Sequence, residues 1–136
     1  MNRNAITRLN AHGNLDTSFD PGEAIGGTTP VVYSVAVESE GKVVIGGAFT
    51  SVNGTTRNRI GRLNDDGNLD DSFRPGPADQ VSQFGPDNVV RAVAIQGDGL
   101  ILVAGEFTTY EVPGQNSQGN PQPLKADARV ARIGGL

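Results

Sequence analysis

The feature of this sequence that most limits its fold is a unit that occurs twice and begins a third time. Residues 6–22 read ITRLN, one further residue and then HGNLDTSFDPG, and residues 60–76 read IGRLN, one further residue and then DGNLDDSFRPG, at an offset of 54 positions. Residues 35–50 recur at 93–108, at an offset of 58 positions. Repeats of this length are typical of folds in which each unit buries its apolar face only against neighbouring units. We therefore expect a chain with about two units to leave faces uncovered, and this shortage is the main functional clue.

Charge and composition exclude several classes of function. The chain has 136 residues, 11 basic and 15 acidic, and no block of like charge that could hold a phosphate backbone, so we expect no nucleic acid partner. It has no cysteine, which excludes disulfides and thiolate metal sites. The first residues lack the apolar stretch of a secretory signal, and no apolar run has the length that crosses a bilayer. We therefore expect no membrane insertion.

Apolar residues occur in short runs rich in valine and isoleucine, separated by Gly, Asn, Asp and Pro, which predicts strands joined by tight turns and no long helix. The runs 43–45 and 100–103 are continuously apolar, so we expect both to be covered on both faces. Glycines follow them directly, at Gly46, Gly47 and Gly105. Glycine is tolerated inside a strand where another backbone comes very close.

A third type of strand is predicted at 59–64, with counterparts at 5–10 and 129–133. After its first two copies, a Gly-Asn pair predicts a two-residue hairpin turn, followed by an outer strand at 15–19 or 69–73. If the four strand types are labelled A to D, the chain reads C-D, A-B-C-D, A-B-C. The predicted units are a partial blade at 1–22, a complete blade at 31–76 and a partial blade at 89–136 with a long loop at 112–127. Four-stranded units of this length arranged radially make a β-propeller, which needs roughly four to eight blades.

Residues 32–50 and 58–73 resemble the delta-60 repeat, a β-propeller family of unknown function. Its pattern runs approximately V-x-A-L-A-V-Q-x-D-G-K-I-L-V-G-G-x-F-T and then R-x-A-R-L-N-x-D-G-x-L-D-x-S-F. The resemblance implies a propeller fold, in proteins that are mostly bacterial and often surface-associated, without an established set of catalytic residues. Members usually string many repeats in one polypeptide, whereas this chain has about two. We therefore predict that further copies complete the ring, as a six-bladed homotrimer, a count that leaves one C strand per chain without a place.

Three arginines, Arg8, Arg62 and Arg132, occupy the same place in the three C strands. They could form a ring that binds an anion, but we favour pairing with nearby carboxylates between blades. Asp16 and Asp70 each stand two residues before a serine and are expected to cap the local backbone. The acidic run 65–71 is predicted to be a hairpin turn rather than a calcium site. We predict no catalytic residues, no metal site and no cofactor.

The most unusual segment is 112–127, which lengthens the connection between the B and C strands by 12 residues relative to the first copy. Long loops without secondary structure are usually functional or disordered. We favour a contact loop that grips the next subunit or an outside partner, and disorder is the alternative. The candidate contact residues are Tyr110, just before this segment, and, within it, Gln115, Asn116, Gln118, Asn120 and Gln122. Phe84, in a shorter insertion at 79–87, is a second candidate, although its ring could equally cap the blade beneath it.

The function that these observations favour is a non-catalytic structural or adhesion module that assembles into a ring and binds another protein. A bacteriophage virion component, such as a capsid decoration or tail protein, would fit, as would a scaffold on the bacterial cell surface. The first alternative is a lectin with sugar sites between blades. The absence of Trp and the presence of only two Tyr and five Phe count against it, because sugars stack on aromatic rings. The second alternative is a lyase or hydrolase that uses loop carboxylates.

Overall fold

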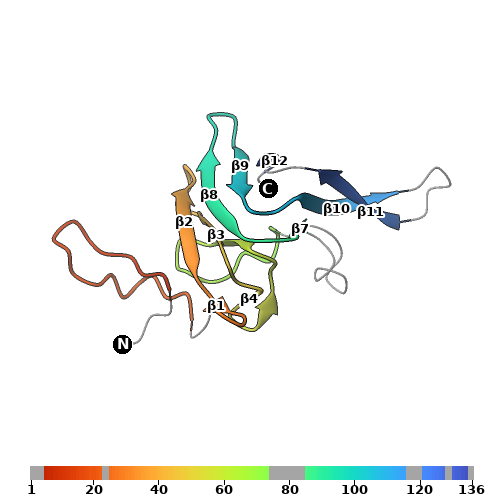
Figure 1. The fold of residues 1–136 in the computed structure, drawn as a ribbon. Helices are drawn as coiled ribbons and strands as arrows, with labels where there is room; N and C mark the ends of the chain where they lie inside the picture. Colours follow the sequence, from red (N-terminus) through yellow and green to blue (C-terminus); the bar gives the residue numbers. More distant parts are fainter. Residues whose placement is uncertain (1–4, 23–24, 74–84, 116–120, 128–129, 135–136) are drawn as a thin grey trace.

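The computed structural model describes residues 5–22, 25–73, 85–115, 121–127 and 130–134, and the structural statements below concern these residues. They form twelve strands and no helix, in four three-stranded antiparallel sheets (Figure 1). The prediction of an all-β fold is therefore confirmed. The strands are β1 Ile25–Gly26, β2 Val32–Val37, β3 Val43–Gly47, β4 Ser51–Val52, β5 Thr55–Thr56, β6 Ile60–Leu63, β7 Gly85–Pro86, β8 Val90–Ile95, β9 Leu100–Gly105, β10 Thr109–Gln115, β11 Pro121–Asp127 and β12 Val130–Gly134.

Two of these sheets are the main building units, and we call the sheet β2-β3-β6 blade 1 and the sheet β8-β9-β12 blade 2. In both, the first strand has a register shift at the same place, after Val32 in β2 and after Val90 in β8. β2 and β8 lie side by side (Figure 1), and the Val93 amide donates a hydrogen bond to the Ser34 hydroxyl at 3.1 Å. The repeat in the sequence is thus a repeat in the structure.

Four hairpins close with the same turn. In the first, the Gly13 amide donates to the Asn10 carbonyl at 2.9 Å, and the Asn10 amide donates to the Asn14 carbonyl at 2.8 Å. Because only the glycine has a positive φ, this is a type I turn followed by a left-handed residue, and the predicted two-residue turn is wrong. The glycines at this position are Gly13, Gly41, Gly67 and Gly99, with φ between 83° and 91°.

The predicted outer strands at 15–19 and 69–73 are also wrong, because each is a single bridge followed by a turn. The bridges are Leu9–Leu15 and Leu63–Leu69. After the first bridge, the Asp16 carboxylate accepts a hydrogen bond from the Ser18 amide at 3.0 Å, and this local bond bends the chain out of the extended conformation. The bend carries Phe19 into the core, where its side chain is buried.

The long connection at 112–127 was expected to be a loop, but most of it forms a hairpin. β10 and β11 pair from Thr109 and Asp127 at one end to Gln115 and Pro121 at the other. In blade 1 the short hairpin β4-β5 occupies the same place, so the insertion lengthens a hairpin that the repeat already has. The ladder pairs the backbone of a segment rich in Pro, Gln and Gly, residues with little preference for strands, and composition therefore did not reveal it.

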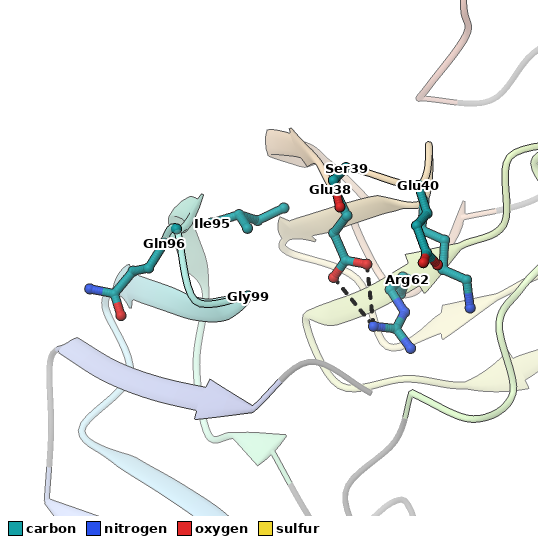
Figure 2. A pocket seen from close by; sticks show the side chains of 9 residues that line it. Glu38, Ser39, Glu40, Arg62, Ile95, Gln96 and Gly99 are labelled. Atoms are coloured by element: carbon teal, nitrogen blue, oxygen red, sulfur yellow. Dashed lines mark hydrogen bonds and ion pairs between the residues drawn. The ribbon is translucent and has the colours of Figure 1, made fainter.

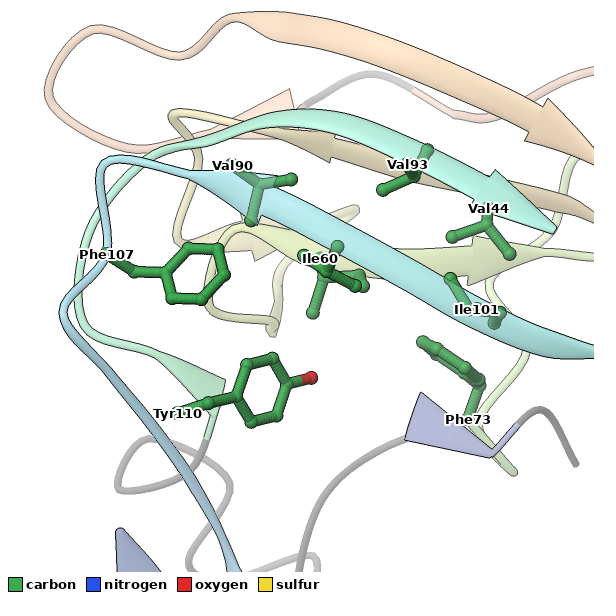
Figure 3. Close-up of a cluster of buried hydrophobic side chains, with 9 residues drawn as sticks. Val44, Ile60, Phe73, Val90, Val93, Ile101, Phe107 and Tyr110 are labelled. Carbon is green, nitrogen blue, oxygen red and sulfur yellow. The ribbon is translucent and has the colours of Figure 1, made fainter. Parts of the chain in front are cut away.

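The core consists of two apolar clusters, one on each side of blade 1. Figure 3 shows the first cluster, which lies between the blades. The second lies on the opposite face of blade 1, where Phe19 and the partly buried Ile6 pack against it. The buried members are Val44, Ile60, Phe73, Val90, Val93, Ile101, Val103, Phe107 and Tyr110 in the first cluster, and Phe19, Ile25, Val43, Ile45, Phe49, Val52 and Leu63 in the second. β3 is therefore buried on both faces, as predicted for residues 43–45.

The matching strand of blade 2 is covered on one face only, so the prediction for residues 100–103 is wrong. Ile101 and Val103 of β9 are fully buried in the cluster between the blades. Leu100 and Leu102, which alternate with them, are only half-buried. The physical reason is that, within the described part of the chain, no sheet packs on the second face of blade 2.

The predicted close backbone approach is confirmed at Gly47 and Gly105, whereas at Gly46 the close neighbours are the side chains of Val90 and Val93. A Cβ at Gly47 would clash with the Val31 carbonyl oxygen, and a Cβ at Gly105, its counterpart in blade 2, would clash with the Val89 carbonyl oxygen. Each glycine therefore lets the first and second strands of its blade come together where the first strand begins.

Candidate functional site

The candidate site is a pair of open sheet faces. We call the face of blade 1 turned away from blade 2 the leading face, and the face of blade 2 turned away from blade 1 the trailing face. On the leading face, Val35 and Val37 of β2 are 52% and 66% exposed. On the trailing face, Ala94 of β8 is exposed and Leu102 of β9 is half-buried. We take these neighbouring exposed apolar side chains as the candidate contact surface.

The repeat itself shows what covers these positions. Val93 and Ile95 stand 58 positions after Val35 and Val37. Val93 and Ile95 pack into the cluster that also holds Val44 of blade 1, and Val93 is therefore only 8% exposed. The leading face of blade 1 thus corresponds to the covered face of blade 2, but no sheet of the described residues lies in front of β2. Residues 5–22 cover its outer part through Phe19 but supply no counterparts of the strands β2 and β3.

A recurring set of four side chains, which we call the arginine clip, fixes the outer edge of the first unit and of blade 1. Arg62 Nε donates to the Asp70 carboxylate at 2.8 Å, and the same carboxylate accepts from the Ser72 amide and hydroxyl at 3.0 and 2.6 Å. The guanidinium lies 4.8 Å from the centre of the Phe73 ring. The first unit repeats these contacts at 2.8, 3.0, 2.6 and 4.9 Å, with Arg8, Asp16, Ser18 and Phe19.

The clip of blade 1 is buried, since the side chains of Arg62 and Asp70 are 1% and 7% exposed. Burial opposes ionisation of Asp70, but the hydrogen bonds from Lys42, Ser72 and Arg62 outweigh it and hold the pKa of Asp70 well below its ordinary value. Lys42 Nζ lies 2.8 Å from the Asp70 carboxylate, and Arg62 Nη1 lies 3.3 Å from Glu38. Lys42 and Glu38, at the two ends of the β2–β3 turn, therefore add one basic and one acidic side chain to this clip.

The clip of the first unit is more exposed, with Arg8 and Asp16 side chains at 34% and 27%. Hydrogen bonds from Ser18 and then from Arg8 lower the pKa of Asp16. Arg8 Nη1 donates to the carbonyl and the carboxylate of Asp65 at 3.0 and 2.9 Å, which ties this unit to blade 1. We expected pairing between blades, whereas the Nε atoms of Arg8 and Arg62 pair with a carboxylate of their own unit, and the contact of Arg8 to Asp65 crosses between units.

Arg132 occupies the same strand position in blade 2, but its surroundings differ. It is exposed, and it makes no ion pair with the described residues. It pairs with Leu102 in the β9–β12 ladder, as Arg62 pairs with Val44 in the β3–β6 ladder. Arg62 and Arg132 therefore share a register position in their ladders, whereas among the described residues the clip is formed by Arg8 and Arg62.

A cleft of about 420 Å³ opens between the β2–β3 turn and the β8–β9 turn (Figure 2). Its lining has acids, bases and backbone but no aromatic ring on which a sugar could stack. The lining residues are Glu38, Ser39, Glu40, Lys42, Arg62, Ile95, Gln96, Gly97 and Gly99. Within the described residues, no three His, Asp or Glu side chains gather closely enough to hold a metal ion.

Gln96 is a residue of this region that the sequence reasoning missed. It stands 58 positions after Glu38, so the repeat could have indicated it. In Figure 2 its side chain points away from the Glu38–Arg62 pair. Its Oε1 atom is buried and has no hydrogen-bond partner among the described residues, which is costly for a polar atom.

The candidate contact residues are not brought together in the described structure. Tyr110 is a core residue rather than a contact residue, because it is 4% exposed and packs edge-on against Phe107 at 6.1 Å. Gln115 and Gln122 lie in β10 and β11. The remaining candidates, Asn116, Gln118, Asn120 and Phe84, lie outside the described residues.

Asp87 anchors the start of the long hairpin and was also missed. Its carboxylate accepts hydrogen bonds from the Thr108 and Thr109 amides at 2.8 and 3.1 Å and from the Thr108 hydroxyl at 2.9 Å. Burial opposes ionisation here, but these hydrogen bonds outweigh it and lower the pKa of Asp87 to about 2.

The repeated antiparallel sheets, two of which pack side by side, form an all-β fold of the kind expected for part of a β-propeller. Comparison with known families agrees, since residues 2–19 and 38–73 match the family model described as "Domain of unknown function (DUF5122) beta-propeller". No curated protein and no solved structure matches the chain. No helix of the described residues is long and apolar enough to cross a membrane.

Proposed function

We propose that the chain is a non-catalytic β-propeller module that assembles with further copies of itself into a closed ring, in which the trailing face of one copy packs on the leading face of the next. We also propose that its repeats are delta-60 repeats. The observation that carries the ring proposal is the difference between equivalent residues. Val93 is covered by the preceding blade, whereas Val35, at the same position of its own unit, is open to solvent.

The trailing face carries apolar side chains that match those packed on a leading face inside the chain. Within the chain, Ala36 and Val44 of blade 1 pack against the leading side of blade 2. Their counterparts 58 positions later are Ala94 and Leu102, which keep the same pairing of a small and a branched side chain. Because Val35 and Val37 are 52% and 66% exposed in the single chain, their full burial would stabilise each joint by roughly 1–2 kcal/mol per side chain.

The two faces are different surfaces, so the contact is heterologous and continues from copy to copy until a ring closes. With two blades from each chain, three copies would give a six-bladed ring, within the roughly four to eight blades that propellers use. At one position, the packing between two copies must be looser than the packing between the two blades of one chain. Ala104 of the trailing face stands where blade 1 has Gly46, and a Cβ at Gly46 would lie 2.5 Å from Val90.

Substitution of each face separately tests the proposal. We expect the wild-type chain to have three times the mass of one chain by light scattering, and Val35→Glu and Ala94→Glu each to lower that mass. Both residues are exposed, so neither change introduces a charge into the core, and circular dichroism should show an unaltered fold. Val35→Thr, which keeps the branched shape without a charge, is the control and should still assemble.

A mixture of the two variants gives a sharper result. Val35→Glu keeps an intact trailing face and Ala94→Glu keeps an intact leading face, so an equimolar mixture should form a one-to-one dimer and nothing larger. A wild-type chain that stays monomeric at high concentration would refute self-assembly. An Ala94→Glu variant with the wild-type mass would refute the pairing of these two faces.

The ring is proposed to serve a structural or adhesion role, with an outside protein as partner. β10 and β11 support this, because they extend away from the two blades (Figure 1) and their hairpin is the segment that the repeat does not require. The lectin alternative gains no support from the inter-blade cleft, whose lining has no aromatic ring.

A further inference from the structure

The inference concerns which strand completes blade 2 when two copies meet, and it rests on the proposed function. We define the N-terminal hairpin as residues 5–19, which contain a C-type segment, the Leu9–Leu15 bridge and an arginine clip. The hairpin already lies against the leading face of blade 1, where Phe19 is buried. A second copy must dock beside it.

The packing of the two blades inside the chain fixes where that copy would lie. The cluster between the blades includes Ile60 and Phe73 from the blade 1 side, and the cluster at the leading face includes Phe19 and Ile6 at the positions 54 residues earlier. The N-terminal hairpin thus occupies the place that β6 and residues 69–73 occupy in front of blade 2. If a second copy packs its trailing face there in the same way, its own β12 would coincide with the hairpin.

Both strands fit β9 in one register, so one can replace the other. β12 places Ala131 opposite Val103 and Arg132 opposite Leu102. The β3–β6 ladder places Gly61 opposite Ile45 and Arg62 opposite Val44. Transferred through the repeat, this ladder would place Thr7 opposite Val103 and Arg8 opposite Leu102. The exchange would therefore keep the ladder and change only its third strand.

The buried oxygen of Gln96 favours the N-terminal hairpin as the occupant. In blade 1 the acceptor at this position is Glu38, which receives Arg62 Nη1, while Nε and Nη2 of the same guanidinium reach Asp70 and Ser72. In blade 2 the acceptor is Gln96, whose Oε1 atom has no partner among the described residues, and Arg132 is exposed.

Arg8 is equipped to supply the missing donor. Its Nε and Nη2 atoms reach Asp16 and Ser18, as in the buried clip, and only its Nη1 atom turns to a different partner, the exposed Asp65. Placed on β9 of a second copy, this Nη1 atom would face Gln96 as Arg62 Nη1 faces Glu38.

We propose that the N-terminal hairpin of one copy replaces β12 on β9 of its neighbour and forms a composite blade, with Arg8 of the first copy donating to Gln96 of the second. Two strands of this blade, β8 and β9, come from one chain, and the third strand with its clip comes from the next. β12 is then the strand left without a place, which accounts for the surplus C strand in the strand count.

Paired cysteines test the exchange, in a chain that contains no cysteine of its own. Opposite residues of an antiparallel ladder have Cα atoms roughly 4.5–5.5 Å apart, within the range that a disulfide bridges. Val103→Cys with Thr7→Cys should cross-link different copies, and the covalent product on non-reducing gels should run as a closed ring. Val103→Cys with Ala131→Cys, the matched control, should form its intrachain bond at least tenfold less in the assembled fraction. Val103→Cys alone gives the background.

The outcomes separate this inference from the proposed function. If the mass is that of an oligomer but only the Val103→Cys, Ala131→Cys pair closes, the exchange is wrong and the ring proposal stands. If the mass is that of one chain, the ring proposal itself fails, and the exchange fails with it.

A second set of variants checks the Arg8–Gln96 contact without cysteines. Gln96→Glu copies the acceptor of blade 1 and should tighten self-association by about tenfold, because a carboxylate accepts more strongly from a guanidinium than an amide does. That gain should disappear in an Arg8→Gln background and persist in an Arg132→Gln background. The reverse dependence would show that β12 stays in place and would overturn the exchange.

Discussion

The two arginine clips make one prediction that can be worked out in detail, because they share their geometry and differ in burial. Asp70→Asn keeps the Oδ1 atom that accepts from Ser72 but turns the other oxygen, which accepts from Arg62 and Lys42 at 2.8 Å, into an NH₂ group. The new NH₂ group would then face the N–H donors of Arg62 and Lys42 instead of accepting from them. Asp16→Asn makes the same change at the first clip, opposite Arg8.

The expected losses differ because Arg62 is 1% exposed and Arg8 is 34% exposed. Removal of one partner of a buried pair costs about 3–5 kcal/mol, and we expect the lower end, about 3 kcal/mol, because Glu38 still compensates part of the charge of Arg62. With a urea m-value of about 1.5 kcal/mol/M, the midpoint should fall by about 2 M. For Asp16→Asn we expect only a small shift, since water screens that pair.

Urea titrations followed by far-ultraviolet circular dichroism, with all variants at one protein concentration, measure both shifts. Asp70→Glu is the useful control, because it keeps the charge and should recover part of the loss. Equal shifts for Asp70→Asn and Asp16→Asn would refute the argument, since they would mean that burial does not set the strength of the clip.

Three further predictions follow from the same geometry. The pKa values of Asp70, Asp16 and Asp87 are lowered in the folded chain, so the folded state binds fewer protons at acid pH than the unfolded state does. The urea midpoint should therefore stay level above about pH 5 and fall from there towards pH 2. A midpoint that rose on acidification would contradict this sign. Gly47→Ala should cost about 1–3 kcal/mol by urea titration because the new Cβ meets the Val31 carbonyl oxygen, whereas Gly97→Ala, with open space around it, should leave the midpoint within about 0.5 kcal/mol. Deletion of residues 115–123 should shorten the β10–β11 hairpin and leave ring mass unchanged while abolishing binding to the outside partner; loss of the ring in this variant would instead assign the hairpin to the joint between copies.

The sequence allowed the repeat and the strand-forming segments to be predicted because both depend on local patterns. The apolar runs around Val44 and Ile101 became strands, and the glycines that follow them allow the close backbone approach expected. The outer strands failed because the bond from the Ser18 amide to the Asp16 carboxylate competes with the extended chain, and a pattern of apolar residues does not record that competition.

The candidate site was harder to predict, because it depends on which face each strand turns to which neighbour. Val35 and Val93 have the same residue type and the same place in the repeat, yet one is open and the other covered. Gln96 gives no signal by composition; the repeat aligns it with Glu38, but its importance follows from its unpaired oxygen and from the contact of Glu38 with Arg62, which only the structure shows. Tyr110 was assigned to a contact loop because the connection looked unstructured, although its ring belongs to the core.

The turn shared by the four hairpins has a consequence for how such proteins change over evolutionary time. Its closing hydrogen bonds join residues at most four positions apart, and its conformation needs one glycine rather than support from another sheet. A duplicated stretch of the gene would therefore fold its own hairpins wherever it was inserted, and only the packing between sheets would need to adapt. The number of units per polypeptide is then free to vary by whole repeats.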